Sequence, residues 1–386
     1  MSLKSAPPSP IGSGPEAQPG RPTTPYRQPA RPPHRVLAVD AATGEARRVW
    51  GFPRGDAGFD DGGGSGGGGG ARCAFAGPQG LAVEAATNIL YAADTDHHAV
   101  RRVDLTSGAV TTVGGNGTQG YDYGAGKAGA AQRLPSPWDL AIANLPAGAG
   151  GRSLVVAMAG THQLWALPLG AADAPTVPAG LAATHWTVSS GTGREAPRDA
   201  RTAASTCWAP PSLLVADSES SSVRSMALGV AYPSRALVGG EDLLADNLFA
   251  FGDEDGRGGR ARLQHPLAVA AATDGSGVAY VADSYNHKVK RLDVAGGAVA
   301  SWVGAAKPGA TDGAGSRAGF WEPGGLALSP DGATLYVADT NNGAIRRVDT
   351  ASGSVTTLGV GGIGALLAAS GGGAISGGLS PDARGT

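Results

Sequence analysis

The sequence has few of the residues that carry covalent or metal chemistry. It contains two cysteines, Cys73 and Cys207, which form neither a C-x-x-C pair nor a metal-type spacing. A thioredoxin motif or a zinc site within this chain is therefore excluded. Neither sign of charge is in excess, since 30 basic and 32 acidic residues leave a formal net charge of −2. This balance argues against a bulk electrostatic binder of nucleic acid or membrane, and no apolar run approaches the roughly 18 residues of a transmembrane helix.

Glycine and proline, in contrast, are abundant. The 64 glycines do not fall at every third position, which excludes collagen. Residues 1–34 hold ten prolines and one acidic residue, Glu16, so we expect a disordered segment. The segment is arginine-bearing and acid-poor, as organelle transit peptides are, but its prolines would break an amphipathic helix. A cytoplasmic and a chloroplast location both stay open. Residues 359–386 form a Gly/Ala-rich tail.

Between these ends, residues 35–358 repeat one pattern with a period of about 60 residues. An apolar triplet after Pro or Gly is followed by Tyr-x-Ala-Asp-Ser/Thr, by a β-branched residue with basic neighbours, and by a Val/Thr-rich end. The second copy and the third copy are degraded, and the third has no clear first strand. We predict a half blade at 35–51 and repeats at about 77–117, 134–170, 207–240, 264–304 and 321–358.

Each full repeat holds four short runs rich in β-branched residues and separated by turn residues. In the first copy these runs are Leu81–Val83, Leu90–Ala93, Val100–Asp104 and Val110–Val113. No stretch has an extended helical period. Four antiparallel strands per repeat predict an all-β, six-bladed β-propeller whose first blade is incomplete. A β-helix is the alternative, but its repeats are much shorter. The tail ends in GGLSPDARG, which weakly echoes GGLALSPDG at Gly324–Gly332, so one interpretation is that it supplies a strand that partly closes the ring. The alternative is that the sequence is truncated at both ends, and we favour it because an open sixth blade leaves a bare sheet edge.

Four aspartates recur at the end of the second strand of their repeats: Asp94, Asp217, Asp283 and Asp339. The second copy has Ala159 at what the sequence suggests is this position. We expect these carboxylates to close local Asx turns, as structural residues of the blade. A ring of carboxylates that binds a cation is the alternative, but recurrence in nearly every blade favours architecture. One member of each following basic pair is expected to pair with a turn aspartate.

The second-to-third turn and the loop that joins successive blades emerge on the same face of a four-stranded blade. That face is the candidate partner surface, and its residues are His98, Asn286, His287, Asn341 and Asp312. The histidines could instead be metal ligands or a general base, but no third ligand accompanies them. The loop at Asp253 fails the frame of an EF-hand because it lacks the final glutamate. We therefore expect no metal, no cofactor and no catalytic residue.

The segments YAADTDHHAVRRVD, YVADSYNHKVKRLD and YVADTNNGAIRRVD resemble NHL repeats. A closer likeness, over roughly Val36–Leu358, is to the family that includes NHL repeat-containing protein 2 and the chloroplast suppressor-of-quenching protein. In that family a thioredoxin-like domain precedes a six-bladed propeller, so the resemblance implies a propeller used for protein interaction or regulation. This chain has no thioredoxin-like domain, and no redox activity is carried over to it.

These observations favour a non-enzymatic propeller that binds a protein partner, as a truncated part of a thioredoxin–NHL redox-regulatory protein. One alternative is a propeller-type hydrolase or lyase with a metal in the central channel, for which Glu84, Asp139 and Glu322 are the available acidic residues. The other is an RNA-binding NHL protein, which would need a net basic face. Fold alone does not decide between these functions.

Overall fold

The chain divides into two units, Met1–Pro32 and Pro33–Thr386, and the described residues all belong to the second. The computed structural model describes residues 34–51, 57–61, 73–120, 129–145, 151–161, 163–169, 184–187, 205–209, 212–227, 234–240 and 251–361. The predicted disordered segment up to residue 33, and the predicted closing strand beyond residue 361, lie outside the described residues.

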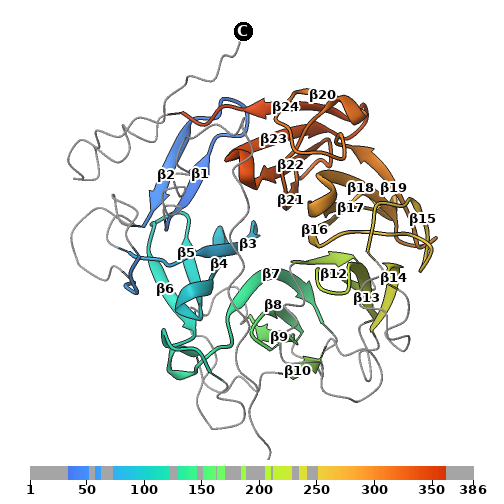
Figure 1. The fold of residues 1–386 in the computed structure, drawn as a ribbon. Helices are drawn as coiled ribbons and strands as arrows, with labels where there is room; N and C mark the ends of the chain where they lie inside the picture. Colours follow the sequence, from blue (N-terminus) through green and yellow to red (C-terminus); the bar gives the residue numbers. More distant parts are fainter. Residues whose placement is uncertain are drawn as a thin grey trace, which may run out of the picture. The chain divides into compact units, whose positions relative to one another are not determined.

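The described residues form short β-strands and single-turn 3-10 helices, with no α-helix among them. Figure 1 shows the sheets following one another around a common centre. Blade 1 contains β3 (Pro78–Glu84), β4 (Ile89–Asp94), β5 (Ala99–Asp104) and β6 (Val110–Gly114). Blade 2 contains β7 (Pro137–Asn144), β8 (Arg152–Met158), β9 (Gln163–Pro168) and β10 (Thr184–Thr187). Blade 3 contains β11 (Ser205–Ala209), β12 (Ser212–Asp217), β13 (Ser222–Ala227) and β14 (Ser234–Gly239).

The last two blades each have a fifth, very short strand. Blade 4 contains β15 (Gly256–Arg257), β16 (Pro266–Ala271), β17 (Val278–Asp283), β18 (Lys288–Asp293) and β19 (Ala298–Val303). Blade 5 contains β20 (Gly313–Ala314), β21 (Pro323–Leu328), β22 (Thr334–Asp339), β23 (Ala344–Asp349) and β24 (Ser354–Leu358). The 3-10 turns are η1 (Thr95–His97), η2 (Gly129–Ala131), η4 (Ser284–Asn286), η5 (Gly315–Arg317) and η6 (Thr340–Asn342).

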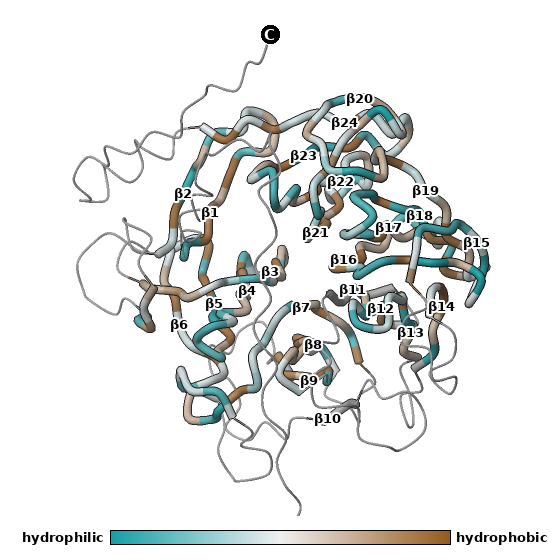
Figure 2. The backbone as a smooth tube through the Cα atoms, viewed as in Figure 1, coloured by the Kyte–Doolittle hydropathy of each residue, from teal (hydrophilic) through white to brown (hydrophobic). Residues whose placement is uncertain are grey.

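The strands of a blade pair in antiparallel order from an inner strand to an outer strand. Successive side chains on a strand point to opposite faces of the sheet, and each face packs against a neighbouring blade. Tyr91 and Val100 of blade 1 thus share a core cluster with Leu140 and Ile142 of blade 2. The strands carry most of the hydrophobic residues, whereas the loops near β15 and β20 are largely hydrophilic (Figure 2). Apolar residues on both faces are why a single blade cannot be stable alone.

In the part of the chain that the structure describes, the loop that leads into blade 1, 4 or 5 runs along the outer strand of that blade. In blades 4 and 5 part of this loop is the extra strand, because β15 pairs with β19 and β20 pairs with β24. The loop then passes beneath the blade and places a fully buried residue three positions before the proline that opens the inner strand. These residues, here called plugs, are Phe75, Leu134, Leu263 and Phe320.

Two local predictions in the degraded repeats were wrong. Blade 3 has a first strand, β11, although its sequence contains no apolar triplet after Pro or Gly. In blade 2, Met158 rather than Ala159 occupies the position of the repeated aspartate, because Pro137 pairs with Met158 as Pro78 pairs with Asp94. The predicted register is off by one residue because neither Met158 nor Ala159 is a polar residue that marks the end of the strand.

The all-β propeller is confirmed, and the described residues form five sheets of four or five strands and a two-stranded sheet where the incomplete first blade was predicted. This sheet, here called the half blade, consists of β1 (Val36–Val39) and β2 (Ala46–Trp50). Trp50 is buried against blade 1 and donates its indole N–H to the carbonyl of Gly108 at 3.2 Å. Figure 1 places the half blade between β24 and blade 1.

Candidate functional site

The turn between the second and third strands of blade 1 is built on a buried ion pair. Asp94 is fully buried at the end of β4, and its Oδ1 accepts the backbone N–H of Ala76 at 2.6 Å. Its Oδ2 accepts from Arg101 Nη1 at 2.9 Å, and the His97 ring lies 3.1 Å from the same oxygen. Arg101, also fully buried, donates to the carbonyl of Ala74 at 3.0 Å. The pair therefore ties the turn to the segment that leads into the blade.

Blade 5 repeats this arrangement seven residues apart. Asp339 accepts from the backbone N–H of Trp321 at 2.7 Å, from Asn342 at 2.8 Å and from Arg346 at 2.8 Å. Arg346 also donates to the carbonyl of Gly319 at 2.7 Å. The three bonds to the carboxylate replace the water that it loses on burial.

Blade 4 uses lysine in place of arginine. Asp283 accepts from the backbone N–H of Gln264 at 2.7 Å and from Asn286 at 2.8 Å, whereas Lys290 Nζ is 3.4 Å away. Lys290 lies closer to a loop carboxylate, Asp253, at 3.0 Å. Burial raises the pKa of Asp283 to about 6, against the effect of Lys290 and the hydrogen bonds. The surrounding carboxylates hold the pKa of Lys290 above its ordinary value despite its burial.

The buried cation also anchors the loop that leads into its blade. Arg101 reaches Asp61 at 2.7 Å, and Arg346 reaches Asp312 at 2.8 Å. The guanidinium groups lie over the plugs of blades 1 and 5, at 5.2 Å from the ring of Phe75 and 5.3 Å from that of Phe320. One side chain thus connects the turn, the loop and the plug, which accounts for its recurrence in the sequence.

The Asx turn predicted at these aspartates is present at Asp217, whose Oδ1 accepts the backbone N–H of Ser220 at 3.2 Å, and absent at the other three. Asp94, Asp283 and Asp339 make no side-chain hydrogen bond that caps the following 3-10 turn, because their oxygens point inward. The Asx turn belongs instead to the aspartate ten residues later: Asp104 accepts from the N–H groups of the two and three residues after it, both at 2.9 Å. Asp40 has, in the half blade, the position of Asp104 in blade 1. The hydrogen bond from the backbone N–H of Thr43 is the main cause that lowers the pKa of the Asp40 carboxyl to about 2.

Blade 2 replaces the ion pair with an apolar pair. Met158 stands at the aspartate position and Trp165, seven residues later, at the arginine position. Both are buried and both belong to the cluster that contains the plug Leu134. This blade shows that the fold accepts hydrophobic residues at the site of the ion pair. Buried ion pairs in other proteins can likewise be replaced by well-packed hydrophobic residues.

A second repeated contact joins successive blades at four boundaries within the described residues. The residue before the third strand bonds a residue just ahead of the next inner strand, and His98, Ser221 and His287 do so in the left-handed backbone region. The bonded pairs are His34 with Gly77 at 2.8 Å, His98 with Ser136 at 3.0 Å, Ser221 with His265 at 3.3 Å, and His287 with Glu322 at 3.1 Å. We call these contacts blade junctions. His34 makes one although the sequence placed it in a disordered segment.

Several residues of the predicted partner surface are occupied by these contacts. His98 and His287 are half-buried at blade junctions, and Asn286 is buried between Asp283 and the carbonyl of Gly252. Asp312 and Asn341 are exposed, although Asp312 also holds Arg346. The first members of the basic pairs, such as Arg101, Lys290 and Arg346, are buried and bonded to carboxylates.

Two exposed aromatic side chains also lie on this face, and the repeat pattern did not predict them. Tyr285 is 48% exposed and stacks on His265 with ring centroids 4.6 Å apart, and Trp321 is 43% exposed. Tyr285 lies two residues before His287 and Trp321 one residue before Glu322, so both are adjacent in sequence to the junction of blades 4 and 5. The Tyr285 ring itself packs on His265, which belongs to the junction of blades 3 and 4. A departure from the repeat could have revealed them, since the other copies carry Asp96 or Asn341 in place of Tyr285.

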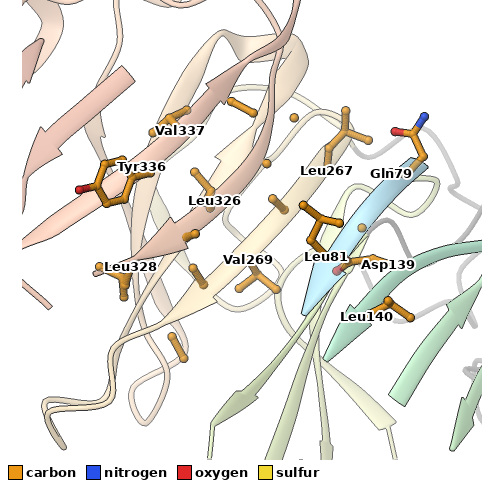
Figure 3. Close-up of a pocket in the computed structure, with 18 of the residues that line it drawn as sticks. Gln79, Leu81, Asp139, Leu140, Leu267, Val269, Leu326, Leu328, Tyr336 and Val337 are labelled. Atoms are coloured by element: carbon orange, nitrogen blue, oxygen red, sulfur yellow. The ribbon is translucent and has the colours of Figure 1, made fainter. Parts of the chain in front are cut away.

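The inner strands surround a central channel that opens into a cavity of about 610 Å³ (Figure 3). Its walls are mainly small and apolar, with Asp139 among them. Glu84 stands at the far end of β3, where it pairs with Arg152, whereas Glu322 precedes β21 at the opposite end of an inner strand. The structure therefore does not bring Glu84 and Glu322 together. Within the described ranges no group of three His, Cys, Asp or Glu side chains is placed to hold a metal.

The chain has close relatives among characterised sequences, although no protein-family model matches it. It is 40% identical over 309 residues to Protein SUPPRESSOR OF QUENCHING 1, chloroplastic, of Arabidopsis thaliana, covering 78% of this chain and 27% of the relative. It is 40% identical over 301 residues to human NHL repeat-containing protein 2, covering 74% of this chain and 40% of the relative. The chicken protein of that name is 38% identical over 82% of this chain and 43% of its own.

The chain spans less than half the length of these relatives. Among solved structures, a Bacteroides thetaiotaomicron protein of unknown function aligns with a TM-score of 0.52 at 17% identity, covering 80% of this chain and 62% of its own. That likeness is one of fold. The resemblance stated from the repeat motifs is confirmed. No helix in the described part of the chain has the length and apolarity to cross a bilayer.

We predict that Asp339→Ala destabilises the protein by about 3–5 kcal/mol, because it leaves Arg346 buried without its fully buried carboxylate. Asp331→Ala, in an exposed hairpin of the same blade, is the control and should change stability little. Urea unfolding followed by fluorescence measures both. Equal effects of the two substitutions would show that the buried pair has no special role.

The apolar pair of blade 2 predicts a compensating double substitution in blade 5. Asp339→Met and Arg346→Trp should each be strongly destabilising alone, since each strands one buried charge. Combined, they should cost less than the sum of the two by about 1–3 kcal/mol. The same unfolding measurement closes the double-mutant cycle, and simple additivity would contradict the equivalence of the two pairs.

The junction made by His98 predicts a loss of stability on mild acidification. Burial lowers the pKa of His98, so the folded state favours the neutral ring and this contribution is lost as the pH falls below about 6.5. Ser221 fills the same position in blade 3, so the His98→Ser variant keeps a polar group that does not titrate there. Between pH 7.5 and 5.5 its melting temperature should fall less than that of the natural protein. An identical fall in both would contradict the assignment.

Proposed function

Because this chain is an NHL-repeat β-propeller related to NHL repeat-containing protein 2 and to SUPPRESSOR OF QUENCHING 1, we propose that it is a non-enzymatic module that binds a protein partner. The binding surface is the boundary of blades 4 and 5 on the face that carries the repeated turns. The observation that carries this proposal is the exposure of Tyr285 and Trp321 at that boundary. Exposed aromatic side chains of this kind are enriched at the centres of protein interfaces.

The surroundings of the two aromatic residues suit a protein partner. Their backbones are fixed, because the N–H of Tyr285 bonds to Gln264 at 3.2 Å and the carbonyl of Trp321 accepts from Asn341 at 3.1 Å. Rigid aromatic groups lose little entropy on binding. Exposed polar groups, among them Asn341 and Asp312, provide a rim, and the half-buried His287 and buried Asn286 support it from below.

The same geometry speaks against the two alternative functions. The cations of the turns are paired with buried carboxylates, so they are not available to phosphate groups of RNA. A hydrolase or lyase needs acidic groups that converge on one reacting atom. Of the three acidic residues considered for that role, Glu84 and Glu322 lie at opposite ends of their inner strands, whereas Asp139 lines the cavity without either of them.

We place this module within a larger regulatory architecture. The support is that the chain covers 27% to 43% of the three relatives described above, two of which are named for NHL repeats and one for suppression of quenching. The family resemblance implies a thioredoxin-like domain ahead of the propeller. Sequencing of the full-length transcript, with the intact mass of the native protein, tests whether C-x-x-C-bearing sequence accompanies this propeller, and one relative in the chloroplast makes that compartment the first to examine.

We predict that Tyr285→Ala combined with Trp321→Ala removes partner binding. The full chain is tagged and purified together with the proteins that bind it in its native extract. The amount of specific partner protein recovered should fall at least tenfold when both rings are truncated. Phe59→Ala is the matched control, because Phe59 is 42% exposed on the loop leading into blade 1, away from this boundary. Melting temperatures confirm that each variant is folded.

Equal partner recovery from all three proteins would contradict the proposed surface. A stoichiometric metal ion in the purified chain would contradict the non-enzymatic proposal and favour a channel enzyme. Binding to RNA that weakens steeply with salt would favour the other alternative.

A further inference from the structure

The ring of blades has an apolar slot between blade 5 and blade 1. The half blade fills only the outer part of this position, and within the described residues β1 pairs with β2 alone. The face of blade 5 that points into the slot is exposed where other blades are covered. Thr340 is exposed and Ala344 half-buried, whereas their equivalents Thr95 and Ala99 in blade 1 are buried.

The opposite wall of the slot shows the same exposure. Leu81 and Val83 of β3 are 48% and 60% exposed. The equivalent of Leu81 is Leu140 in blade 2 and Val269 in blade 4, and both are only 3% exposed because the preceding blade covers them. Figure 3 shows Leu81 in the same cavity as Tyr336 of blade 5. Both walls thus lack the pair of inner strands that a sixth blade would contribute.

The last described residues of the chain stand at the mouth of this slot. In blades 4 and 5 the lead-in loop is held by the N–H of one glycine, which bonds to the hairpin glycine of that blade: Gly258 to Gly297 at 2.9 Å, and Gly315 to Gly353 at 3.2 Å. Gly361 makes the same bond to Gly44 of the half blade, at 3.0 Å. Gly44 has φ +74°, and a side chain there would collide with the carbonyl of Gly359. The chain after β24 is therefore bound to the half blade as a lead-in loop is bound to its blade.

The sequence beyond Gly361 continues the spacing of the lead-in loops. The plugs Leu134, Leu263 and Phe320 each follow their glycine, Gly129, Gly258 or Gly315, by five residues. Leu366 follows Gly361 by the same interval, and the sequence then runs to Gly377–Ser380, the segment that echoes an inner strand. The 25 residues after Gly361 can extend to about 80 Å at 3.3 Å each, against about 15 Å across a four-stranded blade.

We propose that the slot is a docking surface for residues 362–386 of the same chain, with Leu366 as the plug of the half blade and the segment around Leu379 as an added strand beside β1. The free edge of β1 supplies backbone donors and acceptors. Leu81, Val83 and Tyr336 supply the apolar walls that the added strand covers. The occupant is in cis because Gly361 already holds the chain at the mouth of the slot.

Hydrogen exchange of the full chain tests the proposal. Peptides that cover Leu379 and β1 should exchange at least tenfold more slowly than an unstructured segment. Leu366→Asp should remove this protection and raise the fluorescence of a bound hydrophobic dye several-fold. Leu367→Asp is the matched control, because the residue after a plug is half-buried in Gln264 and exposed in Trp321 of the two blades next to the slot on the C-terminal side, although Ala76 and Pro135 are buried at this position.

Unprotected exchange in both peptides of the natural chain would overturn the proposal, as would equal effects of the Leu366 and Leu367 substitutions. A chain ended at Gly361 should bind more dye than the full chain, and equal dye binding would also count against an occupied slot. Protection that appears only in a concentration-dependent dimer would replace the cis occupant with the tail of a second copy.

Discussion

A buried aspartate that faces a cation seven residues later holds together the parts of a blade that are distant in sequence. The carboxylate binds the backbone just ahead of the inner strand, and the cation binds the loop and packs on the plug. Neither charge could remain buried alone, because its lost hydration is replaced only by the other members of the network. The position of the loop, and with it the turn face, therefore depends on this pair. Lysine in blade 4 preserves the network with a longer contact, as Lys290 leans toward the loop.

The apolar pair in blade 2 places a limit on that dependence. Met158 and Trp165 fill the same volume without charge, so the blade needs a filled site rather than an ionic one. The ion pair and the apolar pair differ in how much of the surrounding structure they specify. An ion pair with several directed hydrogen bonds specifies the path of the loop, whereas an apolar pair specifies only that the space is occupied.

The fold was predictable from the sequence because the repeat is dense in directional signals. Prolines mark the inner strands and aspartates mark the turns, and the strands of blade 1 begin and end within a few residues of their predicted limits. Where such signals fade, the prediction failed, as in the one-residue error at Met158 and in the strand missed at Ser205–Ala209. The inward orientation of Asp94 could not be read from the sequence, since a local Asx turn uses the same residue type. Exposure of Tyr285 and Trp321 depends on which neighbour covers each turn, a property of packing between blades that one sequence does not record.

The blade junctions have a consequence for how the molecule responds to force and heat. Each junction couples one blade to its successor only, so a ring with every junction made has no weakest end, and a ring interrupted at one boundary behaves as a linear array with two ends. In the described residues the interruption lies between blade 5 and the half blade, because Thr340 has no counterpart of the bond that Thr95 makes to the carbonyl of Pro137 in the next blade. We expect fraying to start at this boundary and the central blades to be the most protected, because they are farthest from both ends. A segment that occupies the slot closes the ring of contacts between blades and removes the two ends from which unfolding starts. It therefore stabilises blades with which it makes no contact.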